Sequence, residues 1–255
     1  MHGDATSDGA SGNQPVTVWL RSTESTMIDA AALAERGEPH GTVVVAEAQT
    51  GGIGRHGHRW HSDDSGGLYV SVILRLTLAP RDLPLLTMAL GLGVLEAVQG
   101  FCDVPADIRW PNDILIGGRK LAGILVQTPA VRVQIAGIGI NINQTDFPES
   151  LRDLATSLRI VTGLEQVKQR LLDDIVAACL QQADRLAAGG REEVLRQFER
   201  CSSCVRGMEV EVAGPRPIRG VSDGLDADGF LRVRTTNGVE TVLTGGVRQA
   251  RSSVT

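Results

Sequence analysis

Residues 108–127 read IRWPNDILIGGRKLAGILVQ, and this stretch decides the fold. Two short apolar runs, Ile108–Trp110 and Ile114–Ile116, flank a Pro-Asn-Asp sequence, which is a strand–turn–strand pattern. The glycine pair at 117–118 predicts a tight turn that leads into a third strand, Leu121–Gln127. The stretch therefore predicts three successive strands joined by short turns.

The residues before this stretch predict further strands and two helices. Ser25 and Thr26 precede an apolar-periodic run, so a helix is expected to begin there and to end at Gly37. Runs of β-branched or apolar residues predict strands, and helical apolar spacing predicts a second helix. The expected strands are Val16–Leu20, at a sheet edge, Thr42–Glu47 and Leu68–Leu76, and the expected second helix is Leu83–Gln99.

The residues after the stretch continue this mixture of strand and helix. Val131–Ile142 is rich in β-branched residues and predicts a long strand. Helical apolar spacing then predicts three helices. These are Leu151–Leu158, Leu164–Leu186 and Glu192–Phe198.

The character of the chain changes near Cys204, after which short apolar runs alternate with turn signals. The dipeptides Asp228-Gly229 and Asn237-Gly238 favour two-residue hairpins. Strands are expected at Val205–Val212, Ile218–Gly224, Phe230–Arg234 and Val239–Leu243. This spacing predicts a small all-β barrel of roughly 50 residues, a size at which domains can fold.

The chain is thus expected to have two globular parts and a tail. Residues 1–15 are small, polar and rich in glycine and serine, so we expect a disordered N-terminal tail there. Residues 16–204 predict a mixed sheet with helices, and residues 205–255 predict the small barrel. The expected fold class is α+β.

Composition and charge limit the possible functions. The chain has 255 residues, of which 42% are hydrophobic, so it can bury a core. Its formal net charge is −5, which excludes a global basic field, so non-specific nucleic-acid binding is not expected. Any phosphate must therefore be met by a local basic cluster.

The sequence favours a cytoplasmic protein. No secretory signal is found at the N-terminus, and the nearest candidate for a membrane span, Leu85–Val98, is short and interrupted by Glu96. Four cysteines in a chain of this length do not indicate a disulfide framework. The expected compartment is a reducing cytoplasm, with no membrane partner.

The segment GIGRHG at residues 52–57 matches the pattern G-x-G-x-x-G. A dinucleotide fingerprint needs a helix directly afterwards, but residues 58–67 lack helical periodicity and contain a glycine pair. An anion site fits better, because Arg55, His56, His58 and Arg59 lie among glycines whose N–H groups can approach a ligand. The structural alternative is a solvated loop.

A second cluster surrounds the turn at Asp113. Lys120 stands where a turn re-enters a strand, so its ammonium can point into a cleft and bind phosphate. The alternative for an isolated lysine is a solvated turn residue. Asp113 can accept a hydrogen bond from a ligand N–H, and its alternative is an Asx-turn acceptor.

In this order the motifs resemble those of biotin–protein ligases, also called biotin–[acetyl-CoA carboxylase] ligases. The motifs are Ser25-Thr26-Met27, EAQTGGIGRHG at 47–57, WPND at 110–113, RKLAGIL at 119–125 and GIGININ at 137–143. Each motif alone is weak, whereas their combination, from about Val16 to the end of the chain, is specific. The resemblance implies a class II synthetase-like catalytic domain with a mixed sheet flanked by helices, and a C-terminal SH3-like barrel.

The resemblance also implies the reaction. Biotin attacks the α-phosphate of ATP, with Mg²⁺ on the phosphates, to give biotinoyl-5′-AMP and pyrophosphate. A lysine of a biotin carboxyl carrier domain, from acetyl-CoA carboxylase or another biotin-dependent carboxylase, then takes the biotinoyl group. A DNA-binding role is not expected, because only a polar tail precedes Val16. The oligomeric state is expected to be a monomer or a weak homodimer.

The resemblance assigns residues to each part of this reaction. Arg55 and Lys120 are expected to be catalytic, because they neutralise the repulsion between carboxylate and polyphosphate. The residues expected to bind biotin are Ser25, Thr26, Met27, Gln49, Ile53, Gly54, Arg55 and Lys120. Those expected to bind the adenylate or ATP are Gly52, Trp60, Asn112, Asp113 and Asn143. No metal site made of protein side chains is expected.

The chain departs from the family pattern in the glycine loop. The family has G-R-G-R-x-G-R, and Ile53 and His58 stand where the first and last arginines would be, while Arg55 keeps the middle position. The loop is therefore less cationic than in the family. Two other functions remain alternatives: a non-catalytic biotin sensor on the same scaffold, and a lipoate–protein ligase.

Several residues have structural interpretations instead. Trp110 is expected in the core, next to Pro111. A metal site at the histidines of residues 56–61 is disfavoured because no cysteine cluster supports it. Cys201 and Cys204 are interpreted as ordinary cysteines, since no second ligand pair follows them.

Overall fold

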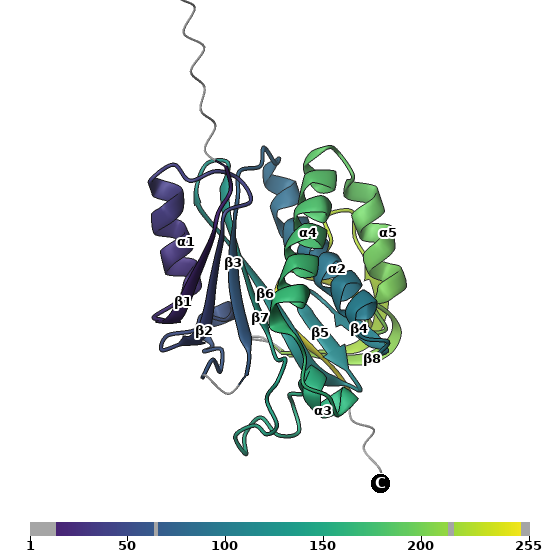
Figure 1. Ribbon diagram of the computed structural model, residues 1–255. Helices are drawn as coiled ribbons and strands as arrows, with labels where there is room; N and C mark the ends of the chain where they lie inside the picture. Colours follow the sequence, from purple (N-terminus) through teal and green to yellow (C-terminus); the bar gives the residue numbers. More distant parts are fainter. Residues whose placement is uncertain (1–13, 64–65, 214–216, 251–255) are drawn as a thin grey trace, which may run out of the picture.

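The computed structural model describes residues 14–63, 66–213 and 217–250. These residues form two β-sheets, with helices on both faces of the larger one (Figure 1). The expected disordered tail, residues 1–15, lies outside the described residues except for residues 14 and 15.

The larger sheet has seven strands in the order β1-β2-β3-β7-β6-β5-β4. Strand β1 lies at one edge and is parallel to β2, and every other pair in this sheet is antiparallel. Residues 108–127 form the end of β4, all of β5 and most of β6, which confirms three consecutive strands. The strands are β1 (Thr17–Thr23), β2 (Val43–Gln49), β3 (Leu68–Leu74), β4 (Ala106–Arg109), β5 (Asp113–Ile116), β6 (Arg119–Ala130) and β7 (Val133–Ile140).

Alternation along the strands places helices on both faces of this sheet. On β2, Val44 packs with Met27 of α1 (Thr26–Glu35), whereas Val43 and Val45 belong to the larger core on the opposite face. The larger core is covered by three helices (Figure 1). These are α2 (Leu83–Phe101), α4 (Lys168–Ala187) and α5 (Arg191–Cys201).

Helix α2 is the central helix of that layer. Together with the short helix η2 (Pro80–Asp82), it is long and apolar enough, by length and composition alone, to cross a membrane. This helical segment is longer than the apolar run Leu85–Val98 that the sequence offered as a candidate span. Most of this window is nevertheless buried inside the protein. Twelve of its residues are buried, and it packs against α4 and the sheet, as expected for a core helix.

The expected helix Leu151–Leu158 is wrong. The segment forms turns and pairs with Lys120: the Lys120 N–H donates to Leu154 O at 2.7 Å, and the Thr156 N–H donates to Lys120 O at 2.9 Å. Because these backbone groups bond to β6, they cannot form a helix with one another. Ser157 then caps a short helix, α3 (Leu158–Thr162), by accepting from the Ile160 N–H at 3.0 Å.

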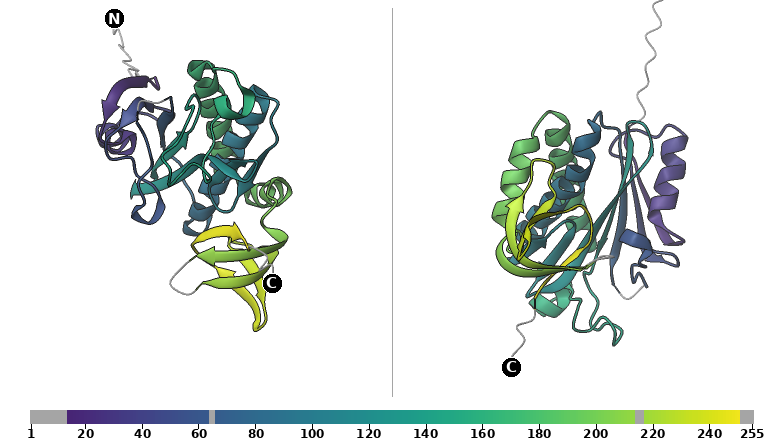
Figure 2. Two further views of the ribbon diagram at one scale, coloured as in Figure 1. Left: turned by 90° about the horizontal axis from the view of Figure 1, so that it is seen from below. Right: turned by 180° about the vertical axis from the view of Figure 1, so that it is seen from behind.

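The smaller sheet has five antiparallel strands in the order β11-β10-β9-β8-β12 (Figure 2). The four expected strands are confirmed, and β12 is an additional one. Within the described residues no ladder joins β11 to β12, so the five strands form one sheet and no closed barrel is assigned to the expected SH3-like part. The strands are β8 (Arg206–Ala213), β9 (Ile218–Leu225), β10 (Leu231–Thr235), β11 (Gly238–Val242) and β12 (Gly246–Gln249).

The two turn dipeptides of this sheet behave differently. Asn237 lies in a two-residue turn, because Thr235 and Gly238 are register partners. Asp228-Gly229 instead lies inside the five-residue connection 226–230 between β9 and β10. The Asp226 carboxylate lengthens this turn, since its Oδ1 accepts from the Asp228 and Phe230 N–H groups, each at 2.9 Å.

Trp110 joins the two sheets. Its side chain is buried, which confirms the expected core role, and its Nε1 donates to Gly229 O at 2.9 Å. Its backbone N–H donates to the buried Cys204 sulfur at 3.4 Å, and all described cysteines are free thiols. Apolar residues of both sheets form one continuous cluster. A division into domains at residue 204 stays a prediction.

The crossing of α2 and α4 allows a test of packing. A Cβ at Gly93 would lie 2.9 Å from the backbone of Ala178 and Cys179, so an alanine must push the helices apart. We expect Gly93→Ala to lower the free energy of unfolding by about 1–3 kcal/mol. Gly100 of the same helix has nothing within 4 Å of its Cβ position, so Gly100→Ala should raise it by about 0.5–1 kcal/mol. Urea denaturation followed by circular dichroism measures both, and effects of the same sign would contradict the packing described.

Candidate active site

A cavity of about 500 Å³ opens over the strand ends of the larger sheet and the glycine loop. Its size suits a small organic ligand. It brings together eleven of the thirteen predicted site residues. These are Ser25, Thr26, Met27, Gln49, Ile53, Gly54, Arg55, Trp60, Asn112, Asp113 and Lys120.

Asp113 is the charged centre of this pocket. Its Oδ1 forms an ion pair with Lys120 Nζ at 2.6 Å, and its Oδ2 accepts from Arg109 Nη2 at 2.7 Å. Burial alone would raise the pKa of this carboxyl group, but Lys120 and Arg109 together hold the pKa below its ordinary value. The carboxylate therefore stays ionised and fixes both cations.

Arg55 enters the same pocket from the glycine loop. Its Nη1 donates to Asn112 Oδ1 at 3.0 Å, and Asn112 is itself fixed because its Nδ2 donates to Ile124 O at 2.9 Å. Burial lowers the pKa of the Arg55 guanidinium, and the nearby charge of Asp113 opposes that shift. The two predicted catalytic cations, Arg55 and Lys120, thus line the same pocket, Lys120 paired with Asp113 and Arg55 bonded to the neighbouring Asn112.

The glycine loop is an irregular segment. Its one helical turn, η1 (Arg55–Gly57), is interrupted at His56, whose φ is 57°, and His58 is already extended. No helix N-terminus follows within the described residues of the loop, so the geometry of a dinucleotide fingerprint is not met. The segment that contains residues 52–57 is thus a loop, as the sequence predicts.

The floor of the pocket is made of two facing glycines. Gly123 of β6 and Gly139 of β7 are register partners, and the indole of Trp60 lies against both. A Cβ at Gly139 would lie 2.5 Å from the indole, and a Cβ at Gly123 would lie 2.9 Å from it. Lys120 Nζ lies 5.0 Å from the centre of this ring, a cation–π contact. The ring therefore occupies a flat surface that only glycines can leave open.

The opposite end of the pocket is neutral and polar. Ser25 occupies the N-cap position of α1, but its hydroxyl makes no capping bond, contrary to expectation. Instead, Gln49 Oε1 accepts from the first N–H of the helix, that of Thr26, at 2.9 Å. The Ser25 hydroxyl is buried without a hydrogen-bond partner, and the Trp60 indole N–H is in the same condition. Buried unsatisfied polar atoms are costly, so both are candidates to bind a ligand.

Two predicted residues do not line the pocket. Gly52 lies just outside it, where a Cβ would meet Ser62 Oγ at 2.5 Å. The amide of Asn143 is used by Gln166, which donates to its Oδ1 at 2.8 Å and accepts from its Nδ2 at 2.9 Å. Asn141, two residues earlier in the same motif, lines the pocket instead.

The smaller sheet also contributes residues to the pocket, and the sequence did not predict this. Gly245, Gly246, Val247 and Arg248 line the pocket, although they are far from the other site residues in sequence. Thr244, just before them, accepts from Arg55 Nη2 at 3.4 Å. No local pattern predicts this approach, because it depends on how the two sheets pack.

The pocket does not offer a protein-bound metal site. Among the described residues, no group of three or more His, Cys, Asp or Glu side chains could hold a metal ion. Asp113, the acidic side chain of the pocket lining, already uses both oxygens in ion pairs.

Comparisons with known proteins agree on one family. The model of the Biotin/lipoate A/B protein ligase family matches residues 19–143. The bifunctional ligase/repressor BirA of Bacillus subtilis is 34% identical over 239 residues, which are 89% of this chain and 71% of that protein. The biotin--[acetyl-CoA-carboxylase] ligase of Mycobacterium tuberculosis is 33% identical over 221 residues, 82% of this chain and 79% of that protein.

A solved structure gives the same result for the fold. The biotin protein ligase from Aquifex aeolicus, in complex with biotin and ATP, superposes with a TM-score of 0.81 at 31% sequence identity. The match covers 93% of this chain and 99% of that one. Both sheets are therefore included in the likeness.

The charged centre predicts how stability depends on pH. Because the pKa of Asp113 is lowered on folding, its ionised form stabilises the protein above pH about 4, and this contribution is lost as the pH falls through the folded-state pKa. We expect Asp113→Asn to lower the free energy of unfolding by about 2 kcal/mol at pH 7. The difference from the wild type should shrink as the pH falls below about 4.

Asp146→Asn is the control for this prediction. Asp146 is 70% exposed and pairs with Arg152 at 3.4 Å, so its loss should change the free energy of unfolding much less than the loss of Asp113. Denaturation curves at several pH values measure both variants. A wild-type advantage over Asp113→Asn that stays constant down to pH about 3 would contradict this role of the carboxylate.

Proposed function

Because this chain belongs to the biotin/lipoate A/B protein ligase family, we propose that its pocket holds biotin against ATP and that Arg55 and Lys120 neutralise the reacting charges. The chain is a ligase that activates biotin with ATP to biotinoyl-5′-AMP and transfers it to a carboxylase carrier domain. The observation that carries the residue assignment is that Arg55 and Lys120 line one pocket, Lys120 paired with Asp113 and Arg55 bonded to the adjacent Asn112.

The first half-reaction sets an anion against an anion. The biotin carboxylate forms a bond to the α-phosphorus of ATP, and the bond to the leaving pyrophosphate breaks. Arg55, Lys120 and Arg109 line the pocket, and Asp113 is the carboxylate partner of Lys120 and Arg109, which leaves positive charge in excess. In a partly buried site this charge lowers the repulsion much more than it would in water.

The neutral end of the pocket suits the ureido head of biotin. The buried Ser25 hydroxyl can donate to the ureido oxygen or accept from a ureido N–H, which would satisfy it. Met27 lies against Gly137 of β7, so the wall beside this end is apolar. An apolar slot that ends in a few fixed polar groups is the environment that biotin needs.

The valeryl arm of biotin would cross the floor made by Gly123 and Gly139. In this structure the Trp60 indole lies there, so it must move before the arm can bind. Once moved, the ring can cover the adenylate and exclude water from the mixed anhydride. In this proposal, Trp60 covers the pocket floor in the free protein and covers the adenylate once biotin is bound.

The second half-reaction consumes the mixed anhydride. The carrier lysine forms an amide bond to the acyl carbon, the bond to phosphate breaks, AMP leaves and the amine loses a proton. The protein contributes position rather than covalent chemistry, since the anhydride already contains its leaving group. A cytoplasmic location agrees with the free thiols of the described cysteines and is part of the proposal.

The function is tested by biotin-dependent exchange between ATP and pyrophosphate, and by the mass of a carrier domain after incubation. Lys120→Ala should lower the exchange rate by about 10²–10³-fold, because it removes one charge at the reacting centre. Lys168→Ala, on α4 outside the pocket, is the matched control and should change nothing. Binding of biotin without exchange would favour a sensor, and exchange with lipoate alone would favour a lipoate ligase.

The position of Trp60 gives a prediction about biotin binding alone. If the indole covers the floor most of the time, Trp60→Ala removes a competitor and should tighten biotin binding by about tenfold in the absence of ATP. Trp19→Ala, at a 45% exposed residue of β1, should leave the affinity unchanged. Isothermal titration calorimetry measures both, and weaker binding by Trp60→Ala would show that the indole packs on biotin rather than replacing it.

A further inference from the structure

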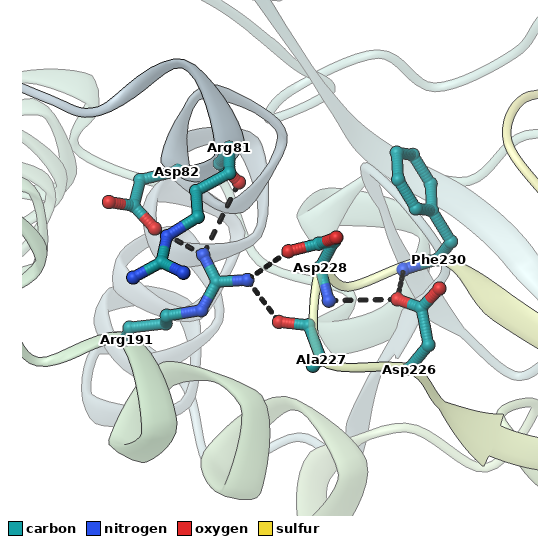
Figure 3. Close-up of polar contacts among 7 residues, drawn as sticks. All are labelled: Arg81, Asp82, Arg191, Asp226, Ala227, Asp228 and Phe230. Atoms are coloured by element: carbon teal, nitrogen blue, oxygen red, sulfur yellow. Dashed lines mark hydrogen bonds and ion pairs between the residues drawn. The ribbon is translucent and has the colours of Figure 1, made fainter.

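The largely buried side chain of Arg191, on α5, hydrogen-bonds to the start of α2 and to the β9–β10 loop (Figure 3). Arg191 begins α5, and its side chain is 16% exposed. Its Nη1 donates to the Asp82 carboxylate and, at 3.3 Å, to Arg81 O, at the start of α2. Its Nη2 donates to Ala227 O and to the Asp228 carboxylate, in the β9–β10 loop. The planar guanidinium therefore binds a helix of the large body and a loop of the small sheet at once.

The loop that Arg191 binds is itself ordered. Asp226 closes it by accepting two backbone N–H groups, as described above. Gly229 presses on α2, where a Cβ would lie 2.5 Å from Leu85 and 3.0 Å from Met88. Gly229 O also accepts from Trp110. Movement of this loop therefore moves the small sheet against the large one.

The same part of the small sheet reaches the pocket. Leu231, directly after the loop, is the register partner of Val242, and Thr244 lies two residues beyond Val242. The Thr244 hydroxyl contacts both residues of the glycine loop that approach it, Arg55 Nη2 at 3.4 Å and His56 Nε2 at 3.2 Å. The following residues, 245–248, line the pocket.

A partly open pocket of about 110 Å³ lies between α2 and the connections of the two sheets. Arg55, Trp110 and Phe230 are among the residues that line it. Tight packing usually fixes the distance between two layers. Where packing is incomplete, hydrogen bonds between the layers, such as those of Arg191 and Thr244, contribute more to fixing that distance.

We propose that Arg191 is a positioning residue for the nucleotide end of the pocket. By tying the β9–β10 loop to the start of α2, it sets the place of Thr244 and residues 245–248 over Arg55. This inference rests on the proposed function, and it takes the part of the pocket near Arg55 and Asn112, the latter predicted to bind the nucleotide, as the nucleotide end, with Ser25 at the biotin end. Arg191 itself is absent from the pocket lining, so it acts through the sheet.

The kinetic test uses Arg191→Gln in the full chain. We expect KM for ATP to rise about tenfold in the exchange assay, within the range that small misplacements cause, while KM for biotin changes less than about twofold. Arg191→Lys keeps the charge but not the planar fork, so it should give an intermediate KM for ATP. A residue needed only for stability would lower the active fraction and leave both KM values unchanged.

Arg196→Gln is the matched control. Arg196 is on the same helix and pairs with Glu193 at 2.7 Å, but it is 66% exposed and contacts neither sheet connection. Its loss should leave both KM values unchanged. A double-mutant cycle adds a second criterion: if Arg191 acts through Thr244, its effect on KM for ATP should be smaller in a Thr244→Ala background.

A readout that does not require activity separates this inference from the proposed function. Hydrogen exchange of backbone amides in residues 243–248 and 54–58 should be about tenfold faster in Arg191→Gln than in the wild type and in Arg196→Gln. Unchanged hydrogen exchange of these amides would overturn the proposal. Equal changes in both KM values, or full additivity of the effects of Arg191→Gln and Thr244→Ala, would overturn it as well. If the wild type shows no biotin-dependent exchange between ATP and pyrophosphate, the proposed function fails, and the hydrogen-exchange measurement still decides the role of Arg191 as an anchor.

Discussion

The carboxylate of Asp113, which holds Lys120 and Arg109 on its two oxygens, is the interaction on which the pocket depends. Without this carboxylate, the side chains of Lys120, Arg109 and Arg55 would be three cations in one partly buried pocket, and their mutual repulsion would drive them towards solvent. With it, Lys120 and Arg109 stay paired in the pocket that Arg55 also lines. Under the proposed function, this places a positive centre in the pocket before the nucleotide binds, which is the condition for electrostatic stabilisation of a transition state.

The position of this centre follows from backbone geometry. Asp113 begins β5 and Lys120 is near the start of β6, and the tight turn at 117–118 makes these two strands antiparallel neighbours. The backbone of Lys120 is bonded on its other side to residues 154–156, so the side chain starts from a fixed place. Arg55 comes from a loop and is anchored instead by side chains from both sheets, Asn112 and Thr244.

Local chemistry made a large part of this predictable. Turn residues and apolar runs identified β4, β5 and β6, and the family motifs brought eleven of thirteen site residues into the pocket. The errors have a common physical origin in non-local contacts. Residues 151–158 have helical spacing but bond to Lys120, β12 pairs with β8 far earlier in the chain, and Gln166 takes the amide of Asn143. A single sequence shows what a segment prefers, not which distant segment will compete for its hydrogen bonds.

The facing glycines of the pocket floor lower the stability of the larger sheet. Each glycine in a strand interior loses more conformational freedom on folding than alanine would, roughly 0.5–1 kcal/mol, and two of them face each other in the middle of the larger sheet. Changes that fill Gly123 or Gly139 would remove this conformational cost, but the added Cβ would meet the Trp60 indole and fill the surface across which we propose that the substrate arm lies. Selection for heat resistance and selection for turnover therefore pull these two positions in opposite directions, so a thermostable descendant of this protein should acquire its stability elsewhere.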